Sequence, residues 1–268
     1  MVSAFADRID PGDWGRFQSR IHIGTTRILD LLDEYGVKAT FFVLGWVAER
    51  HPGLVREIHA RGHEIGCHSY KHRLIYDMSP EEFRLDTQRA RKILEDCLGE
   101  KIEGYRAPSY SITPRSIWAL EILADEGFLY DSSIFPVRHD RYGYPGYSRN
   151  VTTQSLGERR IVEVPLSTFS FLGASIPFGG GGYLRLYPSS VTEWAIRYLN
   201  DREAMPVVLY VHPWELDPEQ PRLNGKALSL FRHYVNLRDT REKLSRLLDI
   251  SAFHGMGIYV KKAGLLSN

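Results

Sequence analysis

Two histidines, His68 and His72, stand four residues apart in this chain. Imidazole nitrogens favour Zn²⁺ or another divalent first-row ion over Mg²⁺ and Ca²⁺, which prefer oxygen ligands. If the backbone of residues 68–72 makes a helical turn, both rings can bind one ion. The spacing therefore indicates a hydrolytic metal site, which also needs a third protein ligand and an open position for water. A solvated surface pair has the same pattern, and the chain carries ten histidines.

The residues before His68 predict the element that positions it. Gly62 is typical of a helix C-terminus, and residues 63–67 have the apolar character of a short buried strand. Upstream, the pattern predicts a helix over 22–35, a strand over 39–44 and a helix beginning near Pro52. These alternating segments are typical of βα units.

Further elements follow the same rhythm. Ser79 and Glu82 have the spacing of a capping box at the start of a helix that Gly99 ends. Ser190 with Glu193, and Asp239 with Glu242, repeat that spacing. We expect additional strands over 102–106 and 207–211 and a helix from residue 113. Residues 135–160 and 166–188, rich in tyrosine and glycine, are expected to form long ordered loops.

Three motifs carry polar side chains where a predicted strand ends. They contain Arg106, Asp131 and His212. In α/β barrels the carboxyl ends of the strands form one face, so these side chains are expected to meet near the two histidines. Each of them alone also has a structural explanation: a surface ion pair, a turn residue or a hydrogen-bonded core histidine.

Composition excludes several classes of function. With 268 residues, 43% hydrophobic and 25% charged, the chain is typical of one large soluble domain. A net charge of +1 gives no electrostatic reason to expect nucleic acid or an anionic membrane as a partner. The two cysteines are expected to be small buried thiols. No membrane span or signal segment is recognisable, so we expect a cytoplasmic protein, of unknown oligomeric state.

Taken together and in this order, the motifs resemble the polysaccharide deacetylase family of NodB homology. The similarity extends from about Lys38 to Trp214. The residues of the motifs are most similar to those of the bacterial subfamily associated with exosortase and exopolysaccharide loci. The resemblance implies a distorted (β/α) barrel. We therefore expect one domain over residues 1–268, in which residues 217–268 form a C-terminal extension.

The resemblance also implies an activity, the hydrolysis of N-acetyl groups on amino sugars or a bacterial exopolysaccharide. His68 and His72 would bind zinc or a similar divalent ion together with an aspartate. The implied role of Arg106 is to orient the catalytic base, and that of His212 is to act as general acid with support from Asp131. The remaining implied roles are an oxyanion site at the backbone N–H groups around Ser109 and a sugar pocket lined by Tyr110 and Trp214.

The chain departs from the family at its start. The family's first motif is a strand that ends in an aspartate pair, supplying base and metal ligand, and it should lie just upstream of residues 2–5. Residues 7–20 are instead polar, and the turn-like setting of Asp7, Asp10 and Asp13 makes them poor substitutes. We therefore expect the first strand to be absent and activity to be impaired.

Two alternatives remain open from the sequence. Related barrels open cyclic amides, so a cyclic-amide hydrolase of the same fold fits the motifs. A non-catalytic carbohydrate-binding barrel is the second alternative, although such a protein has little need for all four of His68, Arg106, Asp131 and His212.

Overall fold

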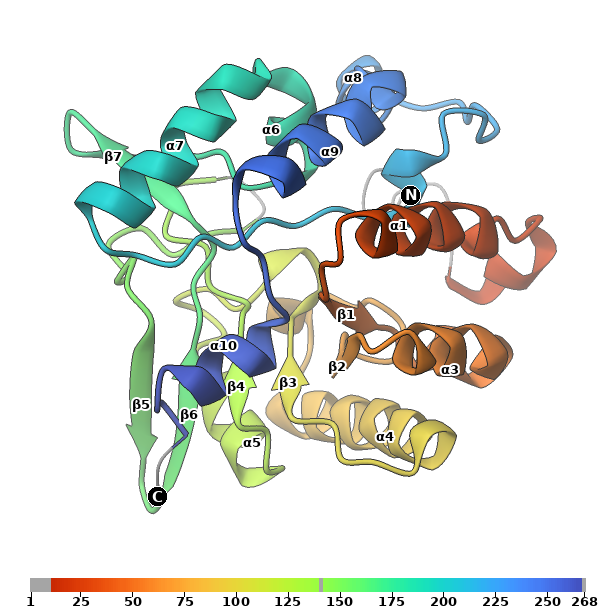
Figure 1. Cartoon of the computed structure of the whole chain (residues 1–268). Helices are drawn as coiled ribbons and strands as arrows, with labels where there is room; N and C mark the ends of the chain where they lie inside the picture. Colours follow the sequence, from red (N-terminus) through yellow and green to blue (C-terminus); the bar gives the residue numbers. More distant parts are fainter. Residues whose placement is uncertain (1–10, 140–141, 267–268) are drawn as a thin grey trace. The chain divides into compact units, whose positions relative to one another are not determined.

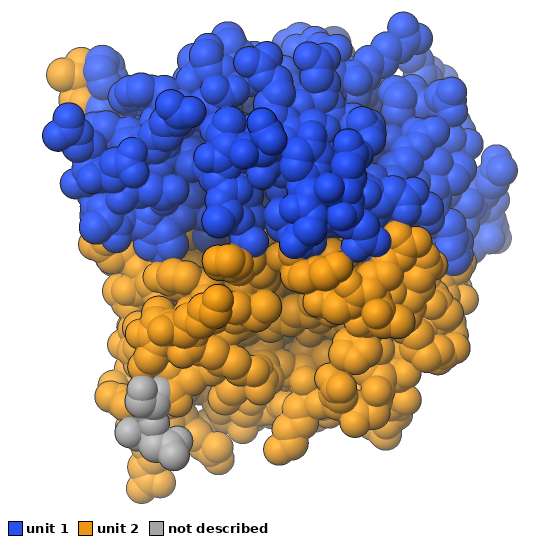
Figure 2. Space-filling model, viewed as in Figure 1, with its two compact units in different colours: residues 1–37, 169–171, 176–253 blue, residues 38–168, 172–175, 254–268 orange. Residues whose placement is uncertain are grey.

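The computed structural model describes residues 11–139 and 142–266, which group into two compact units (Figure 2). Unit 1 comprises residues 1–37, 169–171 and 176–253, and unit 2 comprises residues 38–168, 172–175 and 254–268. The segment 217–268, expected to be one extension, therefore contributes to both units.

Unit 2 is built on a six-stranded sheet in the order β1-β2-β3-β4-β6-β5 (Figure 1). The first five strands in that order run parallel, and β5 pairs antiparallel with β6 at the edge. The expected mixed α/β fold with a parallel sheet is confirmed, but hydrogen bonds among the described strands do not close it into a barrel. The strands are β1 (Thr40–Val43), β2 (Glu64–Cys67), β3 (Gly104–Tyr105), β4 (Tyr130–Asp131), β5 (Thr152–Leu156) and β6 (Arg159–Glu163).

Helices connect the successive parallel strands from β1 to β4. The longest, α4 (Pro80–Leu98), begins with the predicted capping box: the Glu82 N–H donates to Ser79 Oγ and the Ser79 N–H donates to the Glu82 carboxylate. Gly99 ends it at φ 73°, a conformation that glycine adopts without steric cost. The other helical segments of unit 2 are α2 (Gly45–Arg50), α3 (Pro52–Ala60), η3 (Ile75–Asp77), η4 (Pro108–Tyr110), α5 (Ala119–Asp125) and α10 (Met256–Lys262).

The core of unit 2 is aromatic where α4 packs on the sheet. The Phe83 ring meets Tyr105 edge to face at 5.8 Å, and Tyr105 meets Phe128 at 5.5 Å. All three are almost fully buried. Both cysteines are free thiols; Cys67 is buried as expected, whereas Cys97 is only partly buried. Cys67 is fully buried, and burial raises the pKa of its thiol to about 12.

Unit 1 is mainly helical (Figure 1). Helix α1 matches the predicted helix over 22–35, and Gly24 lets its backbone lie against the Pro213 carbonyl. A hydrophobic cluster containing Phe178, Leu199 and Leu247 forms its core. The helical segments are η2 (Pro11–Arg16), α1 (Ile21–Glu34), α6 (Gly181–Leu186), α7 (Ser189–Arg202), η5 (Pro213–Leu216), α8 (Ala227–Tyr234), η6 (Leu237–Asp239) and α9 (Thr240–Ile250).

Several predicted elements were wrong. Residues 207–211 form no strand with any described segment, and their one ladder contact within the described residues is a bridge between Tyr210 and Gly180. The expected loops contain β5, the start of β6, α6 and the two-stranded sheet of β7 (Thr168–Phe171) and β8 (Ala174–Pro177). Helices α7 and α9 begin without side-chain caps.

In the described part of the chain, the first strand is β1, and residues 11–39 form none. Residues 2–5, Asp7 and Asp10 lie outside the described residues, while Asp13 is a half-exposed partner of Arg16 at 2.9 Å. None of the described helices combines the length and the apolar character needed to cross a bilayer.

Candidate functional site

His68 and His72 lie at the carboxyl end of β2 in unit 2, with ring centroids 5.2 Å apart. His68 follows the strand directly, and its N–H donates to the Val43 carbonyl at 3.0 Å. The loop that joins the rings is not a helical turn, because Ser69 and His72 adopt positive φ angles of 67° and 57°. The rings therefore lie near each other on an irregular loop, and the helical turn that the sequence analysis considered is absent from residues 68–72.

A carboxylate from α4 holds this loop. Asp86 accepts a hydrogen bond from Ser69 Oγ at 2.7 Å and one from the Tyr70 N–H at 2.8 Å. The Tyr70 hydroxyl in turn donates to Glu49 at 2.8 Å, and Arg89 lies 3.6 Å from the Tyr70 ring centroid. These contacts stabilise backbone conformations that non-glycine residues rarely adopt.

The tautomer of His68 suits a metal ligand. Its Nδ1 lies 2.6 Å from the Arg106 carbonyl oxygen. Because a carbonyl only accepts, Nδ1 carries the hydrogen and the lone pair is on Nε2. A backbone carbonyl in this position is the usual partner of a metal-binding histidine. The described residues contain no cluster of three or more potential ligands, so they provide two nitrogens of such a site.

Arg106 follows β3 and is nearly buried beside the two histidines. Its Nε donates to the Ser132 carbonyl at 2.9 Å and its Nη2 to Ser132 Oγ at 2.7 Å. The guanidinium also lies 4.5 Å from the centroid of the Phe42 ring. With its carbonyl bound to His68, Arg106 thereby links residues at the ends of β2, β3 and β4.

Asp131 ends β4 and pairs in register with a residue that the sequence interpretation missed, Glu163 of β6. Asp131 accepts hydrogen bonds from Ser133 Oγ at 2.5 Å and from the Ser133 N–H at 3.2 Å. Burial raises the pKa of Asp131, and burial together with the charge of Asp131 raises the pKa of Glu163 well above its usual value. Two buried carboxyls in contact favour one shared proton, which we assign to Glu163.

Ser109 and Tyr110 lie in η4 with positive φ angles of 50° and 53°. The Tyr110 N–H donates to the Ala107 carbonyl at 3.2 Å, and its ring meets Phe135 at 5.6 Å. Positive φ at two successive non-glycine residues is costly, about 1–3 kcal/mol each, and such strain clusters at functional sites.

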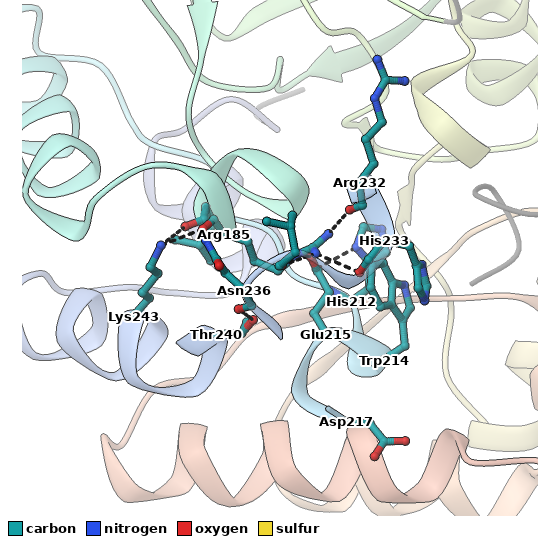
Figure 3. A network of polar contacts seen from close by, with 12 residues as sticks. Arg185, His212, Trp214, Glu215, Asp217, Arg232, His233, Asn236, Thr240 and Lys243 are labelled. Atoms are coloured by element: carbon teal, nitrogen blue, oxygen red, sulfur yellow. Dashed lines mark hydrogen bonds and ion pairs between the residues drawn. The ribbon is translucent and has the colours of Figure 1, made fainter. Parts of the chain in front are cut away.

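His212 and Trp214 lie in unit 1, at the start of η5 (Figure 3). Glu215 accepts hydrogen bonds from the backbone N–H of His212 at 2.8 Å and from its Nδ1 at 3.0 Å. The Trp214 ring stacks on His233, with centroids 4.0 Å apart, and lies 5.7 Å from His212. The His212 side chain is 49% exposed, whereas Glu215 is buried.

The carboxylate that contacts His212 is that of Glu215, a residue that the sequence interpretation did not name, and the support of His212 by Asp131 stays a prediction. The partners of Asp131 are Ser133 and Glu163, all in unit 2. Burial alone would raise the pKa of Glu215, but the His212 hydrogen bond and the charges of His212 and Arg185 hold it below its usual value. The spacing of His212 and Glu215 is that of a capping box, a signal that was present in the sequence.

Comparison with known proteins divides the chain in two. Residues 16–125 match the family described as polysaccharide deacetylase, and residues 132–261 match a domain of unknown function, DUF3473. A peptidoglycan-N-acetylglucosamine deacetylase of Bacillus cereus is 37% identical over 98 residues, which are 36% of this chain and 36% of that protein. The chain thus spans little more than a third of the first curated relatives' length.

Solved structures extend the similarity over most of the chain. A crystal structure from Mycobacterium smegmatis, assigned to the polysaccharide deacetylases, is 26% identical, covers 97% of this chain and 82% of its own, and has a TM-score of 0.62. An allantoinase structure has the same TM-score at 17% identity, covering 90% of this chain and 72% of its own. At that identity the likeness shows the fold alone.

Proposed function

Because the chain belongs to the polysaccharide deacetylase family, we propose that it hydrolyses the N-acetyl amide of an amino sugar in a polysaccharide. The proposed polymer is a bacterial exopolysaccharide, in line with the subfamily that the motifs resemble. The observation that carries the proposal is the His68–His72 pair, in which the Arg106 carbonyl sets the tautomer of His68.

In this proposal His68 and His72 hold Zn²⁺ or another divalent first-row ion. When bound, such an ion polarises the amide carbonyl and lowers the pKa of a water molecule. Backbone N–H groups around Ser109 stabilise the oxyanion, and Tyr110 and Trp214 contact the sugar. His212 protonates the departing amine, a proton transfer that typically contributes about 10²–10⁴-fold to the rate.

Arg106 and Asp131 are proposed to support this site from the ends of β3 and β4. Arg106 places a buried positive charge beside the histidines, where it favours a negatively charged base. Asp131, bonded to Ser133, positions the loop that carries Ser132 and through it the Arg106 guanidinium.

The test combines metal binding with acetate release. We expect the purified chain to bind Zn²⁺ and to release acetate, at an impaired rate, from N-acetylglucosamine oligomers and from acetylated exopolysaccharide. Substituting His68→Ala or His72→Ala should weaken zinc binding by at least about 10–100-fold, the loss typical even of residues that only orient a ligand. His59→Ala is the matched control, because His59 is a surface residue that pairs with Glu100.

Three outcomes would contradict the proposal in different ways. If His68→Ala binds zinc as tightly as the unsubstituted chain does, the proposed metal site is ruled out. Glycan binding without acetate release would identify a non-catalytic carbohydrate-binding barrel. Ring opening of a cyclic amide would identify the other alternative, which the deacetylase relatives do not favour.

A further inference from the structure

Glu215 uses both carboxylate oxygens to connect two side chains of unit 1 (Figure 3). Its Oε2 accepts from the backbone N–H and the ring Nδ1 of His212. Its Oε1 accepts from Arg185 Nε at 2.8 Å. The Arg185 and Glu215 side chains are only 2% and 1% exposed. A buried ion pair of this kind keeps its geometry because either charge alone would be costly in the interior.

Arg185 is itself held by the backbone around α8. Its Nη1 donates to the carbonyls of His233 and Val235, and its Nη2 donates to that of Arg232, each at 2.9 Å. Lys243 and Asn236 bind the Arg185 carbonyl at 2.8 and 3.0 Å. The guanidinium therefore has a fixed position from which it orients the Glu215 carboxylate.

These contacts determine the hydrogen positions of His212. An ionised carboxylate only accepts hydrogen bonds, so His212 Nδ1 carries a hydrogen. The second nitrogen, Nε2, is then the atom that exchanges a proton with a substrate.

We propose that Glu215, held by Arg185, is a positioning residue for His212. Its carboxylate keeps a hydrogen on His212 Nδ1, so that Nε2 is the nitrogen that donates a proton to the leaving amine. The inference rests on the proposed deacetylase function. As the amide C–N bond breaks, its electron pair goes to nitrogen, which takes the proton from Nε2. His212 is left neutral with its hydrogen on Nδ1, and a later proton uptake at Nε2 restores it.

Glu215→Gln is the sharpest substitution because it keeps size and shape. The glutamine amide has one accepting oxygen and one donating NH₂ group, whereas both oxygens of Glu215 accept. If the NH₂ group faces His212, it meets the donating backbone N–H of His212, and His212 Nδ1 must accept a hydrogen bond from it. If the NH₂ group faces Arg185, two donors meet there instead. We expect the first arrangement, in which the His212 hydrogen moves to Nε2 in the neutral ring.

The tautomer is measurable without any substrate. We propose ¹⁵N NMR of the full chain labelled at histidine, at about pH 9, well above the usual histidine pKa. The His212 signals are assigned from their loss in His212→Gln. The expected result is Nδ1–H in the unsubstituted chain and Nε2–H in Glu215→Gln. Nδ1 without hydrogen in the unsubstituted chain would overturn the proposal whether or not any variant folds.

Kinetics on N-acetylglucosamine oligomers give the second readout. Glu215→Gln should lower kcat by about 10²-fold or more with little change in KM, and Glu215→Asp should restore part of the loss. Glu219→Gln is the matched control, because Glu219 is 76% exposed on the same segment and pairs with Arg27. An unchanged kcat in Glu215→Gln would overturn the proposal. An unsubstituted chain that lacks activity but shows the expected tautomers would contradict only the proposed deacetylase function.

Discussion

Two buried glutamates differ in charge: Glu215 in unit 1 is ionised, whereas Glu163 in unit 2 holds a proton. Each is at most 1% exposed, so burial disfavours ionisation of both. Glu215 contacts Arg185 and His212, and its pKa lies below the usual value. Glu163 contacts Asp131, and its pKa lies well above the usual value. The partners, and not the depth of burial, decide whether each carboxyl carries charge.

The difference separates two ways of holding a buried carboxyl group beside a residue that we propose to be functional. In unit 1 an ion pair holds the carboxylate that contacts His212, and removing one partner would leave an uncompensated buried charge. In unit 2 a protonated carboxyl is tolerated beside Asp131 because the pair carries only one negative charge. Substitutions should therefore affect the two units in different ways.

The largest expected effect is loss of the positive charge in unit 1. Arg185→Ala leaves Glu215 buried without its ion-pair partner, which should lower the free energy of unfolding by about 3–5 kcal/mol. Urea unfolding measures it. The control is Arg241→Ala, because Arg241 and Glu34 are both more than half exposed and such pairs contribute no more than about 1 kcal/mol. If both variants lose the same free energy of unfolding, the buried ion pair stabilises the chain no more than the exposed one does.

A smaller effect is expected at the contact that positions η5. A Cβ added at Gly24 would lie 2.1 Å from the Pro213 carbonyl oxygen. Gly24→Ala should therefore destabilise by about 1–3 kcal/mol, the cost of overpacking, despite the higher helix propensity of alanine. Gly53→Ala in α3 has open space and should stabilise by up to about 1 kcal/mol. Thermal unfolding compares them, and stabilisation by both would contradict the close contact.

The third effect, the smallest when counted per pH unit, concerns the pH dependence of unit 2. Because the pKa of Glu163 is raised in the folded chain, the folded state binds more protons than the unfolded state above about pH 4.5. Stability from this group is complete below that pH and is lost as pH rises through the folded pKa, by at most about 1.4 kcal/mol per pH unit. Glu163→Gln keeps an N–H donor toward Asp131 and should remove this loss.

Urea unfolding between pH 4 and pH 8 provides the measurement. The curves of Glu163→Gln and the unsubstituted chain should coincide at the acid end and diverge as pH rises. If the free energies of unfolding of the two proteins change in parallel over the whole pH range, Glu163 does not hold the shared proton. Glu215, whose pKa is lowered, has the reverse dependence, since its stabilisation is lost as pH falls.

Local patterns in the sequence predicted much of unit 2. The strands ending at Val43 and Cys67, the capping box at Ser79 and the end at Gly99 all depend on contacts between near neighbours in the chain. The predicted strands over 63–67 and 102–106 placed His68 and Arg106 at neighbouring strand ends. Parallel strands bring their carboxyl ends to one edge, so order along the chain sufficed to group these residues.

Only the tertiary structure decided the partners of the buried charges. Glu163 meets Asp131 through the pairing of β4 and β6, and Arg185 reaches Glu215 across 30 residues of sequence. The apolar run 207–211 failed as a strand because no neighbouring strand pairs with it in the described residues, apart from the single bridge at Tyr210. The spacing of apolar residues along the chain predicts which side chains are buried. The pairing of strands and the charge of a buried carboxyl depend on groups that are distant in sequence.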